Sequence, residues 1–161
     1  MKITFGGITV TLLLSLVLWA SLGIAMDKVE PPAECKQCGM DRPTFARSRM
    51  MVVYADGSKH GTCSLQCTAA NLKAADGKRI KSILVADYDT RQLIDAKSAK
   101  WVIGGKLPGV MSPVAKWAFA KEQAAKQFIK ENGGKLATFD EALKMAGGDA
   151  TDLRKHGGHK M

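Results

Sequence analysis

The sequence has few of the side chains on which most hydrolytic active sites depend. It contains only three histidines, none of them near a serine nucleophile, and its carboxylates are scattered. The absence of a catalytic constellation predicts a protein that is not an enzyme. No stretch resembles a nucleic-acid-binding module, so we expect no nucleic-acid partner. The net charge of +9 is compatible with simple solubility or with steering toward an anionic surface or an acidic partner.

Residues 3–26 carry no charged side chain, and Lys2 is the one charged side chain before them. The apolar centre at 8–20 has the length of a signal-peptide core, and Gly23-Ile24-Ala25 supplies small residues for cleavage. The whole stretch is long enough to span a bilayer, which takes about 20 residues. Residues 1–25 are therefore predicted to be a signal peptide or a membrane anchor. The remainder is expected in the periplasm or on the outer face of the cytoplasmic membrane. No cysteine ends the apolar run, so no lipoprotein attachment site is predicted.

Hydrophobic patterning and turn signals predict an α+β fold built from two ββαβ units, in a domain at residues 35–146. The first unit covers about 48–87 and contains an Asp56-Gly57 turn, which is a strong hairpin signal. Ser64 is expected to cap its helix. Residues 26–34, which include Pro31-Pro32, are interpreted as a linker. The elements expected in the first unit are strands at 48–54 and 59–63, a helix at 65–74 and a strand at 80–87.

The same order of elements returns at about 99–138, in element order only and not in residue identity. Gly133-Gly134 is expected to end the second helix. A strand at 92–96 precedes this unit. A glycine- and proline-rich loop at 104–113 divides it, and a short helix at 139–146 and a flexible tail at 147–161 follow it. The elements expected in the second unit are strands at 100–104 and 115–120, a helix at 121–132 and a strand at 136–138.

Four cysteines form two close pairs, and the pairs are compatible with several kinds of chemistry. Cys35 and Cys38 lie in a C-x-x-C motif on a loop, whereas Cys63 and Cys67 fall one turn apart at a helix start. The helix dipole there favours a thiolate, and sulfur ligands select copper(I) and zinc over hard cations. The pairs are compatible with a four-sulfur zinc site, or with two structural disulfides in an exported chain. A thiol–disulfide oxidoreductase would need a thioredoxin-like setting, which the flanking linker and hairpin argue against.

Methionines near the cysteines favour copper(I) among the metals. Met40 follows in Cys38-Gly39-Met40, where the glycine lets neighbouring side chains converge. Thioethers are good copper(I) ligands. Met111 lies on the 104–113 loop, where it has little to pack against. His60 is compatible with a ligand or a surface residue, and His156, His159 and Met161 form a small metal-capable cluster in the tail. The predicted metal ligands are Cys35, Cys38, Met40, Cys63, Cys67 and Met111.

Ordered blocks across residues 34–146 resemble the NosL family of nitrous oxide reductase accessory proteins. They begin with Cys35-x-x-Cys38-Gly39-Met40, Tyr54-Ala-Asp-Gly57 and Gly61-Thr-Cys63-Ser64. The later blocks are Lys100-Trp101-Val102-Ile103-Gly104-Gly105, Gly109-Val110-Met111-Ser112-Pro113, Ala118-Phe119-Ala120, Ala125 and Phe128, Gly133-Gly134 and Thr138-Phe139-Asp140-Glu141. The resemblance implies a periplasmic copper(I) chaperone of two ββαβ units that delivers copper to the copper–sulfur cluster of nitrous oxide reductase. It also implies Cys38, Met40 and Met111 as the leading ligands.

Two features of the sequence depart from that family pattern. The anchoring cysteine that typical members carry directly after the signal is missing. Cys67 is an additional cysteine, and the Cys63-Ser-Leu-Gln-Cys67 pair is similar to small TRASH-type or YHS metal modules. Both departures bear more on the identity of the protein that receives the metal than on the identity of the metal. The expected partner is therefore a copper-accepting enzyme or a transporter.

Overall fold

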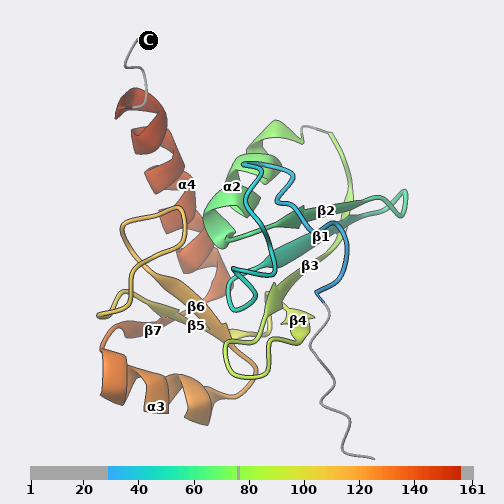
Figure 1. Ribbon diagram of the computed structural model, residues 1–161. Coiled ribbons are helices and arrows are strands. Elements are labelled where there is room, and N and C mark those ends of the chain that lie inside the picture. Colours follow the sequence, from blue (N-terminus) through green and yellow to red (C-terminus); the bar gives the residue numbers. More distant parts are fainter. Residues whose placement is uncertain (1–28, 76, 157–161) are drawn as a thin grey trace, which may run out of the picture.

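Two antiparallel sheets with their helices make up the computed structural model, which describes residues 29–75 and 77–156 (Figure 1). The predicted signal or anchor at 1–25 lies outside the described residues. Within the described ranges, no helix has the length and apolar character needed to cross a membrane.

The first sheet contains the predicted hairpin and has the strand order β2-β1-β3-β4. Gly57 has a φ of 83° in the turn, and Asp56 Oδ1 accepts the Ser58 N–H at 2.9 Å. Ser64 caps the following helix by accepting the Cys67 N–H, as predicted. The elements of this half are β1 (Met50–Tyr54), β2 (Lys59–Thr62), α2 (Leu65–Ala74), β3 (Ile80–Ala86) and β4 (Leu93–Asp95).

The second sheet has the order β6-β5-β7, so its first strand is central, as β1 is in the first sheet. Its elements are β5 (Lys100–Ile103), β6 (Lys116–Phe119), α3 (Glu122–Asn132) and β7 (Lys135–Ala137). The predicted α+β fold of two ββαβ units is confirmed. The short turn between β4 and β5 crosses from one sheet to the other, because β4 pairs with β3 and β5 pairs with β6 and β7.

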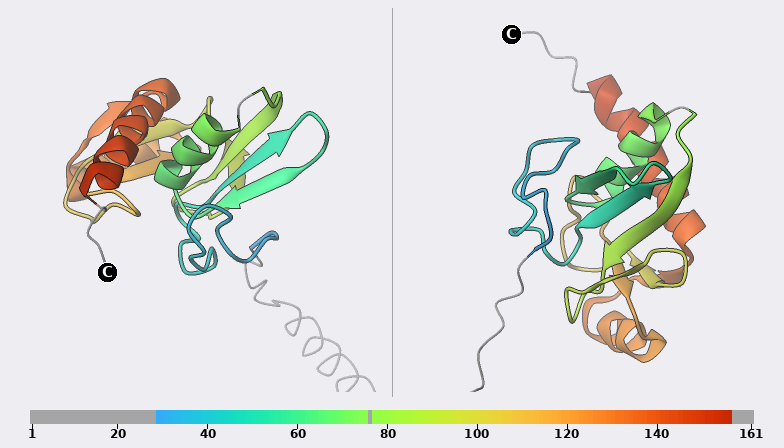
Figure 2. Two further views of the ribbon diagram at one scale, coloured as in Figure 1. Left: turned by 90° about the horizontal axis from the view of Figure 1, so that it is seen from above. Right: turned by 90° about the vertical axis from the view of Figure 1, so that its right-hand side faces the viewer.

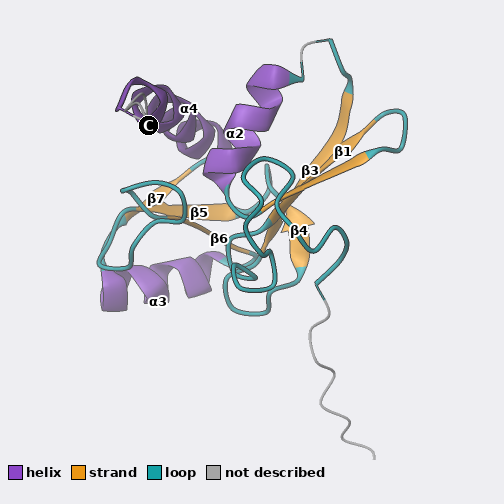
Figure 3. Cartoon of the chain, turned by 45° about the horizontal axis from the view of Figure 1, so that its top comes forward, coloured by secondary structure: helices purple, strands orange, loops and turns teal. Residues whose placement is uncertain are grey.

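The last helix, α4 (Phe139–His156), is longer than predicted. Thr138 and Glu141 form a reciprocal capping box at its start, in which the Glu141 carboxylate accepts the Thr138 N–H at 2.7 Å. The predicted end at residue 146 was wrong because α4 packs along α2 (Figure 3). The Gln66 amide donates to the Ala146 carbonyl and Lys73 donates to the Gly147 carbonyl. These contacts offset the helix-breaking preference of Gly147-Gly148. His159 and Met161 of the predicted tail cluster lie outside the described residues.

Two apolar cores lie on opposite sides of the second sheet. Alternation along β5 sends Trp101 and Ile103 into the larger core and Val102 into the smaller one. The larger core brings together both sheets, α2 and α4, and the smaller one lies between the sheet and α3 (Figure 2). Because Met50 of β1 and Trp101 of β5 share the larger core, the two halves pack as one body.

Candidate metal centre

The segment from Cys35 to Met40, here called the Cys loop, is a compact loop that lies beside β2. The Cys35 N–H donates to the Met40 carbonyl and the Gly39 N–H to the Cys35 carbonyl, both at 2.8 Å. Gly39 has a φ of 78°, a conformation that suits glycine. The Lys36 N–H donates to the Gly61 carbonyl at 2.9 Å and ties the Cys loop to β2. This path buries Cys35 to 2% exposure and leaves Cys38 exposed.

The second pair of cysteines lies at the corner where β2 leads into α2. Cys63 follows the last residue of β2 and is fully buried, and the Ser48 hydroxyl donates to its carbonyl at 2.8 Å. Ser64 caps α2 and accepts the Cys67 N–H at 3.4 Å, which places Cys67 in the first turn. The strand end and the helix cap thus set the positions of both thiols.

All four thiols converge, and their sulfur atoms lie within 4.8 Å of one another. Cys63 Sγ is 3.6 Å from Cys38 Sγ and 3.7 Å from Cys67 Sγ, and all four residues are free cysteines. A tetrahedral metal with bonds of about 2.3 Å separates its sulfur ligands by about 3.8 Å. The spacing therefore suits one soft metal ion held by thiolates. The sequence predicted these four cysteines as metal ligands, and the structure places their sulfur atoms in one cluster.

The crowded thiols do not ionise independently. Hydrogen bonds from Cys63 and Cys67 hold the pKa of Cys35 far below its usual range, although burial opposes the shift. The hydrogen bond to Cys35, together with burial, raises the pKa of Cys63 to about 12. The hydrogen bonds to Cys35 and Cys63, and burial, also raise the pKa of Cys67. These shifts favour ionisation of Cys35 ahead of Cys63 and Cys67, and a metal must displace protons from the thiols as it binds.

Apolar side chains line the buried part of the cysteine cluster. Met40, Phe45 and Val110 pack against the three buried cysteines. Met40 thus lies where the Cys38-Gly39-Met40 motif predicted it. Sequence reasoning missed Phe45 as a wall of the site, because a single aromatic residue in a loop has no ligand pattern. Val110 was also missed, although its signal was available in the Gly109-Val110-Met111 block.

Met111 and His60 lie outside the group of four thiols. Met111 is 39% exposed and has a φ of 55°, while its neighbour Val110 reaches the cluster. A ligand role for Met111 stays a prediction. His60 is half-buried on β2, and its Nε2 is buried with no hydrogen-bond partner among residues 29–75 and 77–156. Burial lowers the pKa of His60, which favours a neutral imidazole, although the nearby Cys35 opposes the shift.

Comparison of the sequence with models of known families places the chain in one of them. The sequence model of the NosL family matches residues 26–145. The chain belongs to the NosL family. Among proteins with curated descriptions, none matches it.

The fold of this NosL-family protein is similar to that in the crystal structure of the copper chaperone NosL from Shewanella denitrificans. The TM-score is 0.55, the match covers 71% of this chain and 95% of that chain, and 22% of the aligned residues are identical. At that identity the likeness concerns the fold alone.

Proposed function

We propose that this NosL-family protein is an extracytoplasmic copper(I) carrier that captures the ion at its four thiols and passes it to a cuproenzyme. One observation carries the proposal: four free thiols converge beside Met40, and one of them, Cys38, is exposed to solvent. Thiolate and thioether sulfur together select copper(I) over hard cations. The related fold belongs to a protein described as a copper chaperone.

The burial of the thiols supports a simple exchange mechanism. Cys35, Cys63 and Cys67 form the buried side of the site, whereas Cys38 is at the surface on the Cys loop. Copper(I) needs few ligands, so an incoming thiolate or thioether can replace Cys38 without opening the core. The protein then acts as a carrier and not as a catalyst.

The proposed acceptor is nitrous oxide reductase, with another copper enzyme or a transporter as the broader class. The NosL family membership and the uncharged segment at 3–26 support a site of action outside the cytoplasm. The test is maturation of copper-free nitrous oxide reductase by the copper-loaded protein, followed by recovery of the copper–sulfur cluster absorbance. Recovery equal to that with free copper(I) complex would reject this client.

The binding itself is tested by competition of the reduced protein with a chromogenic copper(I) chelator. Cys38→Ser and Cys63→Ser are both expected to weaken binding on the order of 10-fold or more, because each removes one ligand of a shared site. Met145→Leu on α4 serves as the control, since it removes sulfur outside the cluster. Normal binding by Cys63→Ser beside lost binding by Cys38→Ser would disprove a single shared site.

A closed structural zinc site is the second candidate. Sulfur separations of 3.6 and 3.7 Å match the tetrahedral value, and three of the thiols are buried. Zinc and copper(I) are distinguished by adding equimolar copper(I) to zinc-loaded protein and measuring free zinc. Release of zinc supports the carrier. Retained zinc, together with a Cys38 thiol that resists alkylation, supports the structural site.

A further inference from the structure

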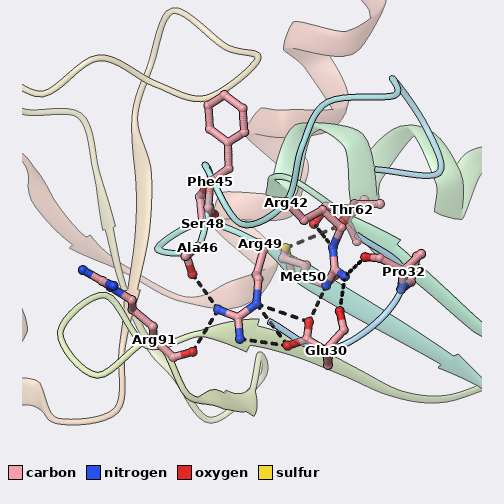
Figure 4. Close-up of polar contacts among 11 residues, drawn as sticks. Glu30, Pro32, Arg42, Phe45, Ala46, Ser48, Arg49, Met50, Thr62 and Arg91 are labelled. Atoms are coloured by element: carbon pink, nitrogen blue, oxygen red, sulfur yellow. Dashed lines mark hydrogen bonds and ion pairs between the residues drawn. The ribbon is translucent and has the colours of Figure 1, made fainter. Parts of the chain in front are cut away.

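Arg42, which is separated from the Cys loop by Asp41 alone, is a charged residue with no exposure to solvent. Backbone contacts join the segments on either side of the Cys loop. Glu34 forms a β-bridge with Asp41, and the Arg42 N–H donates to the Ala33 carbonyl at 2.8 Å. Burial of a guanidinium is costly unless each of its five N–H groups finds an acceptor. Arg42 meets this requirement, because its side chain donates five hydrogen bonds (Figure 4).

The acceptors of Arg42 come from three different segments. Glu30 and Pro32 belong to the segment before the Cys loop, and the Met50 carbonyl, at 3.2 Å from Nη2, belongs to β1. The Thr62 carbonyl on β2 accepts from Nε at 3.2 Å. Thr62 is the residue before Cys63. One side chain therefore connects the end of the loop that carries Cys35 and Cys38 to the strand end that carries Cys63.

Gly61 makes room for this connection. A Cβ atom at Gly61 would lie 2.8 Å from Arg42 Cζ and 2.9 Å from Pro32 Cδ, closer than side-chain atoms pack. The Gly61 carbonyl also accepts the Lys36 N–H from the Cys loop. Because Gly61 has no side chain, the backbone of β2 at this position contacts both the Arg42 guanidinium and the Cys loop.

Glu30 brings the preceding segment into the same arrangement. Its carboxylate pairs with both Arg42 and Arg49. The side-chain hydrogen bonds of Arg49 go to Glu30 and to the carbonyls of Ala46 and Arg91, none of them in the Cys loop. Arg42 and Arg49 are therefore two buried arginines on one carboxylate, and only Arg42 contacts the strand end beside the thiols.

We propose that Arg42 is the positioning residue of the metal site, and that it holds the Cys loop against Cys63 with Glu30 as its partner. The inference rests on the proposed function, because it assigns Arg42 a role in metal capture. A soft metal needs its sulfur ligands placed within a few tenths of an ångström, and groups behind the ligands supply that precision. Without the guanidinium, the loop keeps its short backbone hydrogen bonds, the Lys36 contact and the packing of its own thiols on the cluster, but it loses the polar connection that joins its end to the Thr62 carbonyl.

The test compares Arg42→Met with the matched control Arg49→Met in the full-length protein. Both variants lose a buried arginine beside Glu30, so both are expected to unfold at a lower temperature. Only Arg42→Met should weaken copper(I) binding, on the order of 10- to 100-fold, the range for losing a group behind a metal ligand. In metal-free protein, only Arg42→Met should make Cys35 open to alkylation by iodoacetamide, measured by peptide mass spectrometry.

The alkylation result does not depend on copper, so it separates this inference from the proposed function. Wild-type protein that fails to bind copper(I) rejects the function, whereas Cys35 exposed only in Arg42→Met still supports the positioning role. Equal effects of the two variants on affinity and alkylation would overturn that role. If Arg42→Met does not fold, Arg42→Lys decides, because lysine keeps the charge beside Glu30 and cannot make all five hydrogen bonds. Wild-type affinity and Cys35 protection in Arg42→Lys would overturn the proposal.

Discussion

Cys38 Sγ lies 3.6 Å from Cys63 Sγ across 25 positions of sequence, and the two thiols differ completely in exposure. Cys63 is fully buried at the end of β2, and Cys38 is at the surface on the Cys loop. A metal bound between them contacts both the interior and the solvent. The two ligands should therefore govern different properties of the site. The buried thiol should govern how tightly the metal is retained, and the exposed thiol should govern how fast it is exchanged.

Replacing the exposed or a buried thiol should separate the rate of copper transfer from the affinity. Cys38→Ser is expected to speed transfer to a small thiol acceptor on the order of 10-fold more than it lowers affinity, because it vacates the coordination position that the acceptor thiolate takes. Cys67→Ser should lower affinity and speed release, since Cys67 is 4% exposed and acts on the buried side. Stopped-flow transfer and equilibrium competition measure the two properties. Identical behaviour of both variants would contradict this division of roles.

Methionine replacements test the thioether contribution. Met40 packs against the thiols, so Met40→Leu, which keeps the volume, should weaken copper(I) binding about 10-fold and leave zinc binding unchanged. Met111→Leu should have a smaller effect, because Met111 is exposed and its neighbour Val110 makes the contact with the cluster. Chelator competition with each metal gives the comparison. A larger effect of Met111→Leu would show that the loop carrying it closes over the bound ion.

The elements around the site could be predicted because their signals are local. Ser64 at a helix start and the Asp56-Gly57 turn act within a few residues, and both appear where the pattern placed them. The four cysteines could be named as metal ligands from their spacing, but the sequence left a shared site and two disulfides as alternatives, and their convergence is a finding of the structure.

Features that depend on distant contacts were not accessible from sequence. The ten extra residues of α4 depend on packing against α2, which no local rule describes. Arg42 and Arg49 look like ordinary surface charges in sequence. Their burial depends on the shared Glu30 carboxylate and, for Arg42, on the carbonyls of β1 and β2. The division into one exposed and three buried thiols likewise depends on how the Cys loop lies on β2.

Two helix caps offer a matched test of how local structure supports the site. Ser64→Ala and Thr138→Ala each remove a capping hydroxyl and should each cost about 1 kcal/mol, or roughly 2–4 °C in melting temperature. Only Ser64→Ala should also weaken copper(I) binding, because Ser64 fixes the backbone of Cys67. Calorimetry and chelator competition on both variants give the answer. Equal affinity of the two variants would show that Cys67 keeps its position without the cap.

The Glu30 carboxylate should make the stability of the protein depend on pH in a defined direction. Burial raises the pKa of Glu30, but hydrogen bonds from Arg49 and Arg42 outweigh it and hold the pKa below the ordinary 4.5. The unfolded chain then takes up its proton first, so the stabilisation is complete above about pH 4.5 and is lost as the pH falls through the folded-state pKa. Glu30→Gln cannot titrate and serves as the control for the other carboxylates. The difference in unfolding free energy between wild type and Glu30→Gln, from urea titrations, should favour the wild type at pH 7 and shrink at pH 3. A difference that stays constant with pH would mean that the carboxylate charge contributes nothing to this contact.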